Sequence, residues 1–277
     1  MEPTIRDIQR VELHILQEVR RVCEEHGIGY FLDAGTLLGA ARHQGFIPWD
    51  DDVDLGMLRA DYDRFCAIAP SALSPRFFLQ TPATDPASLV PFAKVRMNGT
   101  RYVGEGLEGR PMHQGFSIDI FPYDTVADGA TFQRACRACR WRSRLYLLRF
   151  APLEHPRTAR QRIGCLAAQA LRRLPERWFT APLSALAARF ADDEGEVVTC
   201  LQYLAEPPRY AIDDVLPFGE LPFEGQPYPV MAQWERCLEA LYGDWRQLPP
   251  EDERTWHRAV EVQLPADLEG DGAPQAA

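Results

Sequence analysis

The feature that most restricts how this chain can fold is a run of four aspartates within five positions. They are Asp50, Asp51, Asp52 and Asp54. Successive side chains of a β-strand point to opposite faces, so a strand here would place Asp52 and Asp54 on one face and the neighbouring valine and leucine in the core. Asp50 continues the first face, whereas Asp51 points away from it. Carboxylates held this close together repel one another unless a cation lies between them, and hard oxygen ligands favour Mg²⁺.

Two other interpretations of the acidic run are open. Asp50, Asp52 and Asp54 stand at the first three ligand positions of a calcium-binding loop. However, Leu55 occupies the position where that loop needs glycine, and Asp61 replaces the usual glutamate at position twelve. A solvated acidic loop without function is the other possibility. The apolar residues between and after the acids favour the strand.

A glycine turn precedes the acidic run. Residues 28–32 are apolar and aromatic, which predicts a short strand, and residues 37–42 have a helical pattern. Gly35 and Thr36 lie between them. A turn from a strand into a helix presents backbone N–H groups that can bind phosphate. An ordinary turn between a strand and a helix is the alternative.

Asp119 is a third candidate acid, in a predicted strand over residues 115–121. Ile118 and Ile120 flank it, and by alternation Asp119 shares a face with Ser117. A carboxylate in the middle of an apolar strand is costly unless it is paired, binds a metal or lies at the edge of a site. An edge-strand aspartate that faces water is the alternative.

The other predicted elements surround these segments. A capping-box pattern at Thr4 and Asp7 begins an amphipathic helix that ends near Gly27. Further strands are predicted at residues 77–80 and 91–97, and further helices at 61–68, 131–177 and 231–241. We predict one domain over residues 1–264, which includes a basic helical region at 131–180, and a disordered tail over 265–277.

The charge of the chain is divided between two regions. The formal charge is 30 − 40 = −10, which argues against a nucleic-acid partner. Between Arg134 and Arg177 there are twelve arginines and two acids, Glu154 and Glu176, so this segment carries +10 and the rest of the chain −20. Solvated arginine faces would account for the segment. The functional alternative is contact with a polyanionic acceptor or with a membrane surface.

Composition also bears on localisation. No apolar run approaches the ~20 residues of a membrane span, and the first residues lack the form of a signal peptide. The seven cysteines are scattered, which favours reduced thiols over disulfides. Cys136 and Cys139 form a C-x-x-C pair, but no second ligand pair stands at zinc spacing. We therefore predict a cytoplasmic protein that either is free or lies peripherally at the inner face of the membrane.

One long motif resembles a known family. Residues 35–54, GTLLGAARHQGFIPWDDDVD, closely resemble the signature of the LicD family, which includes bacterial phosphocholine transferases and is similar to the fukutin and fukutin-related ribitol-phosphate transferases. Residues 94–96, 117–122 and 242–245 follow in the order of the family, and His257 follows them. The resemblance spans residues 20–258, but the arginine-rich segment contains no matching motif.

The resemblance implies an α+β fold, with a nucleotidyltransferase-like mixed sheet flanked by helices and additional helical segments. Asp52 and Asp54 match the first metal-binding pair of that fold, and Asp119 matches its third acid, so all three are candidate catalytic and metal-binding residues for Mg²⁺ or Mn²⁺. Asp50 is a further candidate ligand. The candidate residues for binding substrate phosphate are Gly35, Thr36, Arg42, Lys94 and Arg96. Lys94 is the only lysine in the chain.

The activity implied by the resemblance is transfer of phosphocholine or a polyol phosphate from a CDP-linked donor. The acceptor is a hydroxyl of a glycan, a lipid-linked glycan or another cell-surface polymer precursor such as lipopolysaccharide or teichoic acid, and CMP is released. Two alternatives are nucleotidyl transfer from an NTP, with release of pyrophosphate, and a non-enzymatic module that binds a divalent metal. The released product, CMP or pyrophosphate, distinguishes the two reactions.

Overall fold

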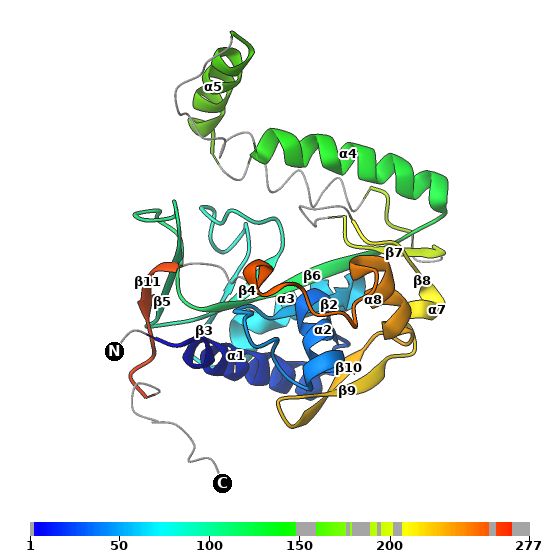
Figure 1. Ribbon diagram of the computed structural model, residues 1–277. Helices are drawn as coiled ribbons and strands as arrows, with labels where there is room; N and C mark the ends of the chain where they lie inside the picture. Colours follow the sequence, from blue (N-terminus) through cyan, green and yellow to red (C-terminus); the bar gives the residue numbers. More distant parts are fainter. Residues whose placement is uncertain are drawn as a thin grey trace.

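An amphipathic helix opens the chain and packs below a central mixed sheet (Figure 1). The computed structural model describes residues 3–147, 159–175, 178, 189–192, 195–201, 207–254 and 259–267. In chain order the elements are α1 (Ile5–His26), β1 (Phe31–Leu32), α2 (Ala34–His43), β2 (Asp54–Leu58), α3 (Arg59–Ala72), β3 (Phe77–Gln80), β4 (Ala93–Met97), β5 (Arg101–Gly104), β6 (Ser117–Val126), α4 (Gly129–Leu147), α5 (Ala159–Arg172), β7 (Val197–Thr199), β8 (Tyr210–Ala211), α7 (Ile212–Val215), β9 (Gly219–Phe223), β10 (Gln226–Val230), α8 (Trp234–Tyr242), the 3₁₀ turn η2 (Glu251–Glu253) and β11 (Ala259–Gln263).

The ends of α1 are set by its sequence. The Thr4 hydroxyl accepts a hydrogen bond from the Asp7 backbone N–H, and the Thr4 N–H donates to the Asp7 carboxylate, which completes a capping box. Gly27 ends the helix with a φ of 59°, a left-handed conformation that glycine adopts without steric cost. Both ends confirm the predicted helix. Two polar residues, Gln9 and Glu12, interrupt its buried apolar stripe.

The main sheet has the strand order β1-β2-β6-β4-β3, and β7 pairs with both β6 and β8 beside this path. Strands β2 and β6 are parallel, and the other described pairings in this sheet are antiparallel. Two small antiparallel pairs, β9 with β10 and β5 with β11, lie outside it. The expectation of a mixed sheet flanked by helices is therefore confirmed.

The two faces of β6 separate two parts of the core. Ile118 and Ile120 pack in the cluster that includes the buried stripe of α1. Phe121 and Tyr123 pack in a second cluster on the other face, with residues from β7, β8, α7 and α8. Because alternate residues share a face, Asp119 points to the same side as Phe121 and Tyr123, away from α1.

Some element boundaries differ from the sequence expectations. The strand expected from Asp52 begins at Asp54, because pairing with β6 begins there, opposite Asp119. The helix expected from residue 37 begins at Ala34, directly after its cap, Asp33. The strands β5, β7, β9, β10 and β11 were not predicted. Each is short or contains glycine or proline, so periodicity in the sequence does not identify it.

The cysteine pair in α4 is part of a small core. Cys136 and Cys139 are buried with Phe132 and Ala135 against Val126 and residues near β7. Burial raises the pKa of the Cys139 thiol to about 12. This environment is typical of packing rather than of redox chemistry. None of the helices in the described part of the chain has the length and apolar character needed to cross a bilayer.

Several predicted features fall on residues that the structure does not describe. In the basic region predicted at 131–180, these are residues 148–158, 176–177 and 179–180. His257 and residues 268–277 of the predicted tail also lie outside the described residues. The first residues of that tail are described, and there the Asp267 carboxylate lies 2.9 Å from an Arg76 guanidinium nitrogen.

Candidate active site

Three charged residues lie in one row across adjacent strands. Asp54 of β2 is the register partner of Asp119 of β6, and Asp119 is the register partner of Lys94 of β4. Directly opposed residues on neighbouring strands have their side chains on the same face, about 5 Å apart at Cβ. Lys94 Nζ donates to Asp119 Oδ1 at 2.5 Å. The register thus brings together three of the residues that the sequence singled out; we call them the charged row.

The segment of Asp50, Asp51 and Asp52 before β2, which we call the acidic loop, lies next to the glycine turn. A Cβ added at Gly35 would lie 2.9 Å from Asp50 Oδ2 and 3.9 Å from Asp52 Oδ1. Any side chain at position 35 would therefore displace the Asp50 carboxylate. The absence of a side chain at Gly35 lets the first turn of α2 approach these two carboxylates closely.

The turn itself is fixed by hydrogen bonds to Asp33 and Thr36. Asp33 caps α2 by accepting from the Ala34 N–H at 2.8 Å, and its other oxygen accepts from the Tyr123 hydroxyl at 2.7 Å. Ala34 has a φ of 42°, an uncommon left-handed conformation for a residue with a Cβ. The Thr36 hydroxyl accepts from the Asp54 N–H at 2.8 Å, which joins the turn to the start of β2.

Asp51 is separated from the other aspartates of the run. It is buried and accepts a hydrogen bond from the Tyr102 hydroxyl of β5. Val53 and Leu55 are also fully buried in the core cluster that includes α1. The expected alternation along residues 51–55 is therefore present, although the regular strand begins later than predicted.

Glu12 of α1 is a functional candidate that the sequence interpretation missed. It is buried, and its Oε2 has no hydrogen-bond partner among the residues that the structure describes. Burial raises the pKa of Glu12 well above its ordinary value, and the charges of Asp52, Asp51, Asp50 and Asp119 raise it further. A glutamate within the apolar stripe of a predicted helix was the available signal, because such a position is costly for an acid without a compensating partner.

Two further carboxylates have raised pKa values. Burial raises the pKa of Asp54 well above its ordinary value, and Asp52 and Asp119 add to the shift, while Lys94 opposes it. Burial raises the pKa of Asp33 to about 6, although its bonds to Tyr123 and Ala34 act in the other direction. Several acids thus lie in a region with one nearby lysine, which favours binding of a cation.

The donor set fits a hard divalent cation that is shared with a substrate. Within the described ranges, no group of three or more His, Cys, Asp or Glu side chains is arranged to hold a metal ion by itself. Mg²⁺ usually takes one or two protein carboxylates and completes its shell with water and phosphate oxygens. The oxygens of Asp52, Asp54 and Asp119, together with Asp50 beside Gly35, are suited to that mode.

The two predicted arginine clamps have protein partners. Arg96 is buried and donates at 2.5 Å to both the Gln80 side chain and the Gly115 carbonyl. Burial lowers its pKa to about 10. Arg42 donates to the carbonyls of Trp245 and Gln247, at 3.0 and 3.1 Å. Each arginine thus joins segments that are separate in the chain.

The acidic loop is also held from outside. Gln9 of α1 donates to the carbonyls of Ile47 and Asp50, at 3.2 and 2.9 Å. Glu224, in the turn between β9 and β10, accepts from the Phe46 N–H at 3.2 Å and pairs with Arg6 at 2.5 Å. These contacts between distant segments position the loop, and no local sequence pattern predicts them.

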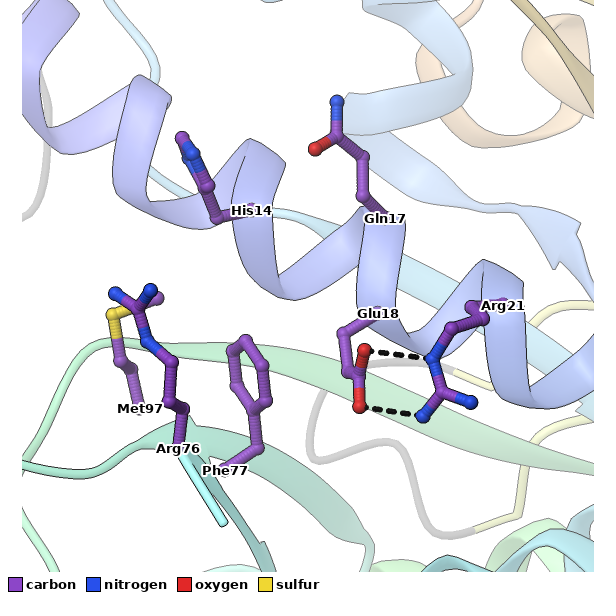
Figure 2. Close-up of a pocket in the computed structure, with 7 residues that line it drawn as sticks. All are labelled: His14, Gln17, Glu18, Arg21, Arg76, Phe77 and Met97. Carbon is purple, nitrogen blue, oxygen red and sulfur yellow. Dashed lines mark hydrogen bonds and ion pairs between the residues drawn. The ribbon is translucent and has the colours of Figure 1, made fainter. Parts of the chain in front are cut away.

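A separate pocket of about 340 Å³ lies between α1 and the strands β3 and β4. Figure 2 shows the lining residues of α1 on one side of it, which are His14, Gln17, Glu18 and Arg21. Residues of the two strands, or next to them, line the other side. The Arg21 guanidinium lies 2.7 Å from the Glu18 carboxylate. None of the candidate site residues lines this pocket, so it is not the site described above. Its remaining lining residues are Arg76, Phe77 and Met97.

Comparison with known proteins identifies a family match within the chain. Residues 27–137 match the protein family described as LicD/FKTN/FKRP, nucleotidyltransferase domain. The chain carries a LicD-family domain. This domain contains the charged row, the glycine turn and the acidic loop, but it ends within α4.

Similarity to one known protein covers nearly the whole chain, beyond the LicD domain. The chain is 29% identical over 275 residues to the lipopolysaccharide cholinephosphotransferase LicD of Haemophilus influenzae, which covers 94% of this chain and 98% of that protein. It is 51% identical over 53 residues to the human ribitol 5-phosphate transferase FKRP, which covers 18% of this chain and 11% of that protein. It is also 41% identical over 56 residues to an uncharacterised protein of Rickettsia typhi. The chain is a phosphotransferase enzyme of the LicD type, so the non-enzymatic alternative is set aside.

Proposed function

We propose that this LicD-type enzyme transfers a phospho-alcohol group, phosphocholine or a polyol phosphate, from a CDP-linked donor to a hydroxyl of a glycan or of a cell-surface polymer precursor. The hydroxyl oxygen would form a bond to the phosphorus that carries the alcohol. The bond from that phosphorus to the bridging oxygen of the diphosphate would break, and CMP would leave. The names of the two relatives, a cholinephosphotransferase and a ribitol 5-phosphate transferase, support this class of transferred group.

The observation that carries the proposal is the charged row of Asp54, Asp119 and Lys94 beside a turn without a side chain at Gly35. Asp52 and Asp54, with Asp119 or Asp50, would hold Mg²⁺ or Mn²⁺. When bound, such an ion neutralises charge on the diphosphate and on the departing phosphate.

The other groups of the site would bind and orient the donor. Backbone N–H groups at Gly35 and the Thr36 hydroxyl lie at the N-terminal turn of α2, where a phosphate is favoured. Asp119 would accept the proton of the attacking hydroxyl, and the ion pair with Lys94 holds its carboxylate in place. Arg42 and Arg96 would add positive charge near the donor while keeping their contacts within the protein.

The first test is a donor screen with the full chain and Mg²⁺. CDP-choline, CDP-ribitol, CDP-glycerol and NTPs are each offered with a panel of glycan acceptors, and the released nucleotide is measured. We expect CMP from one CDP-linked donor. Asp54→Asn should lower that rate at least about 100-fold, which corresponds to about 3 kcal/mol of transition-state stabilisation. Asp63→Asn, which changes an exposed carboxylate on α3, is the matched control. Near-normal turnover by Asp54→Asn would contradict the proposal.

The family description also favours a second candidate, nucleotidyl transfer from an NTP. In that reaction the acceptor oxygen attacks the α-phosphorus and pyrophosphate leaves. Phosphorus NMR of the products separates the two reactions, because one yields CMP and the other pyrophosphate. We further propose that the enzyme acts in the cytoplasm or at the inner face of the membrane, where lipid-linked glycan acceptors are available.

A further inference from the structure

The face of α4 that points away from the protein core is basic. The opposite face of the helix buries Phe132, Cys136 and Cys139 against the small core described above. The outward face carries the exposed side chains of Arg134, Arg137, Arg140 and Trp141. Trp141 is 67% exposed. A tryptophan among arginines has the composition of a surface that lies at the boundary between water and lipid.

Helix α5 exposes apolar residues where a surface helix usually exposes polar ones. Ile163 and Leu166, one turn apart, are 69% and 65% exposed. Arg162 and Arg173 are exposed on the same side, whereas Ala168 is buried on the other. An apolar stripe bordered by arginines and turned outward is the pattern of a helix that lies in a membrane interface.

Both helices lack negative charge. Neither α4 nor α5 contains an aspartate or a glutamate. In the part of the chain that the structure describes, eight large apolar side chains are exposed, and four of them lie in this region. They are Trp141, Ile163, Leu166 and Trp178. The chain outside residues 134–177 has a charge of −20, so it would be repelled by an anionic surface and would leave these helices to face it.

The position of the surface relative to the charged row is also informative. Asp119 points to the face of the sheet opposite α1, and Figure 1 shows α4 and α5 on the side of the sheet away from α1. A bilayer against α4 and α5 would therefore lie on the same side of the sheet as the charged row.

We infer that the outward faces of α4 and α5, with Arg134, Arg137, Arg140, Trp141, Ile163 and Leu166, bind the surface of an anionic lipid bilayer. The arginines contact lipid phosphates, and the apolar side chains enter the boundary between headgroups and acyl chains. Binding to the bilayer is inferred from this surface alone. The role of that binding in reaching a lipid-linked acceptor rests on the proposed function.

The apolar stripe of α5 distinguishes a bilayer from other polyanions. A single-stranded nucleic acid is bound by arginines together with aromatic side chains that stack on bases. Ile163 and Leu166 offer no such stacking surface, but they gain from transfer into lipid. A bilayer uses both the charge and the apolar area of this surface.

Co-sedimentation of the full chain with vesicles tests the inference. We expect binding to vesicles of phosphatidylcholine with 30% phosphatidylglycerol, and much weaker binding to phosphatidylcholine alone. The triple change Arg134→Ala, Arg137→Ala and Arg140→Ala should reduce partitioning by roughly 100-fold, about fivefold for each arginine. The pair Ile163→Ser and Leu166→Ser should also reduce it, with the charge unchanged.

A matched control removes three charges from elsewhere on the surface. It combines Arg64→Ala in α3, Arg236→Ala in α8 and Arg246→Ala after α8. Each of these arginine side chains is more than half exposed. This control should bind vesicles as the original chain does. Equal loss in both triple variants, or binding that is independent of anionic lipid, would overturn the inference. Loss in the arginine variant with none in the serine variant would show that Ile163 and Leu166 do not enter the bilayer and would also overturn the inference.

Different measurements test this inference and the proposed function, so the failure of one can be told from the failure of the other. Asp54→Asn should lose CMP release and keep vesicle binding. The arginine variant should keep CMP release with an acceptor in solution and lose vesicle binding. If the chain releases no CMP with any donor but binds vesicles as described, the surface stands and the proposed function does not.

Discussion

In the charged row, ionisable side chains lie side by side on neighbouring strands and are partly buried, whereas in α4 the arginines lie on a face turned away from the core. Asp54, Asp119 and Lys94 are fixed by strand register. Arg134, Arg137 and Arg140 share a face because of the helix period, and they are exposed. The comparison shows that charge is coupled to the fold in the first region and not in the second. Substitutions should therefore affect stability and catalysis in the sheet, and surface binding in α4.

The largest expected effect is on stability, at an ion pair beside the sheet. Arg59 of α3 donates to both oxygens of Asp124 in β6, at 2.7 and 3.0 Å, and the Asp124 side chain is fully buried. Arg59→Ala should lower the free energy of unfolding by about 3 to 5 kcal/mol, because it leaves a buried carboxylate without its partner. Chemical denaturation measures this effect.

The control for this change is Arg236→Ala, which removes an arginine that is 70% exposed in its pair with Asp214. An exposed pair contributes about 1 kcal/mol or less. Similar losses in the two variants would show that charge in the sheet region is no more coupled to the fold than charge at the surface.

The next effect is on catalysis. Lys94→Gln removes the charged partner of Asp119 and retains hydrogen-bonding ability. We expect a decrease in turnover of about 10- to 100-fold, since hydrogen bonds to charged groups contribute about 1.5 to 3 kcal/mol. CMP release under saturating donor measures it. Arg101→Gln, at an exposed pair with Glu261, should leave the rate unchanged. Unchanged turnover in Lys94→Gln would remove the lysine from the site.

A smaller effect concerns pH and Glu12. In the folded state the pKa of Glu12 is raised, so the folded protein holds a proton that the unfolded chain releases above about pH 4.5. Without divalent metal, the contribution of this group to stability should therefore be greatest below that pH and fall as the pH rises above it, by at most about 1.4 kcal/mol per pH unit. Glu12→Gln should reduce the slope of unfolding free energy against pH. Asp54 contributes in the same direction.

Denaturation at several pH values in the presence of a chelator measures this slope. Glu18→Gln is a suitable control, because hydrogen bonds to Arg21 and Ser74 lower the pKa of Glu18, so its contribution to stability has the opposite sign. An equal slope in the Glu12→Gln variant and the original chain would contradict the assignment.

The smallest expected effect is the stability of the α4 variants. Arg137→Ala and Trp141→Ala each change an exposed side chain on the face that does not touch the core, so each should alter the free energy of unfolding by less than about 0.5 kcal/mol. Thermal or chemical denaturation measures it. Cys139→Ser changes the buried face of the same helix and should cost more. A large loss from either exposed change would show that this face packs against the protein.

Local sequence determined the elements that carry the site. The capping box and Gly27 bound α1, the alternation of acids and apolar residues indicated β2 but placed its start two residues early, and the isoleucines around Asp119 identified β6. These features depend on contacts between near neighbours and on side-chain period, so they can be interpreted from the sequence alone. The resemblance to the LicD family rested on the same segment, and the family match confirms it.

Only the tertiary structure decided which residues meet. The register of β2, β6 and β4 places Lys94 against Asp119, and α1 brings Glu12 close to the acidic loop from about forty residues away in the chain. Arg42 and Arg96 were predicted as residues that bind substrate phosphate, and their contacts with distant carbonyls appear only in the folded chain. The physical reason is that strand pairing and helix packing join segments with no shared local pattern. The sequence by itself identified the aspartates of the candidate site, and the fold decided their partners and brought Glu12 close to them.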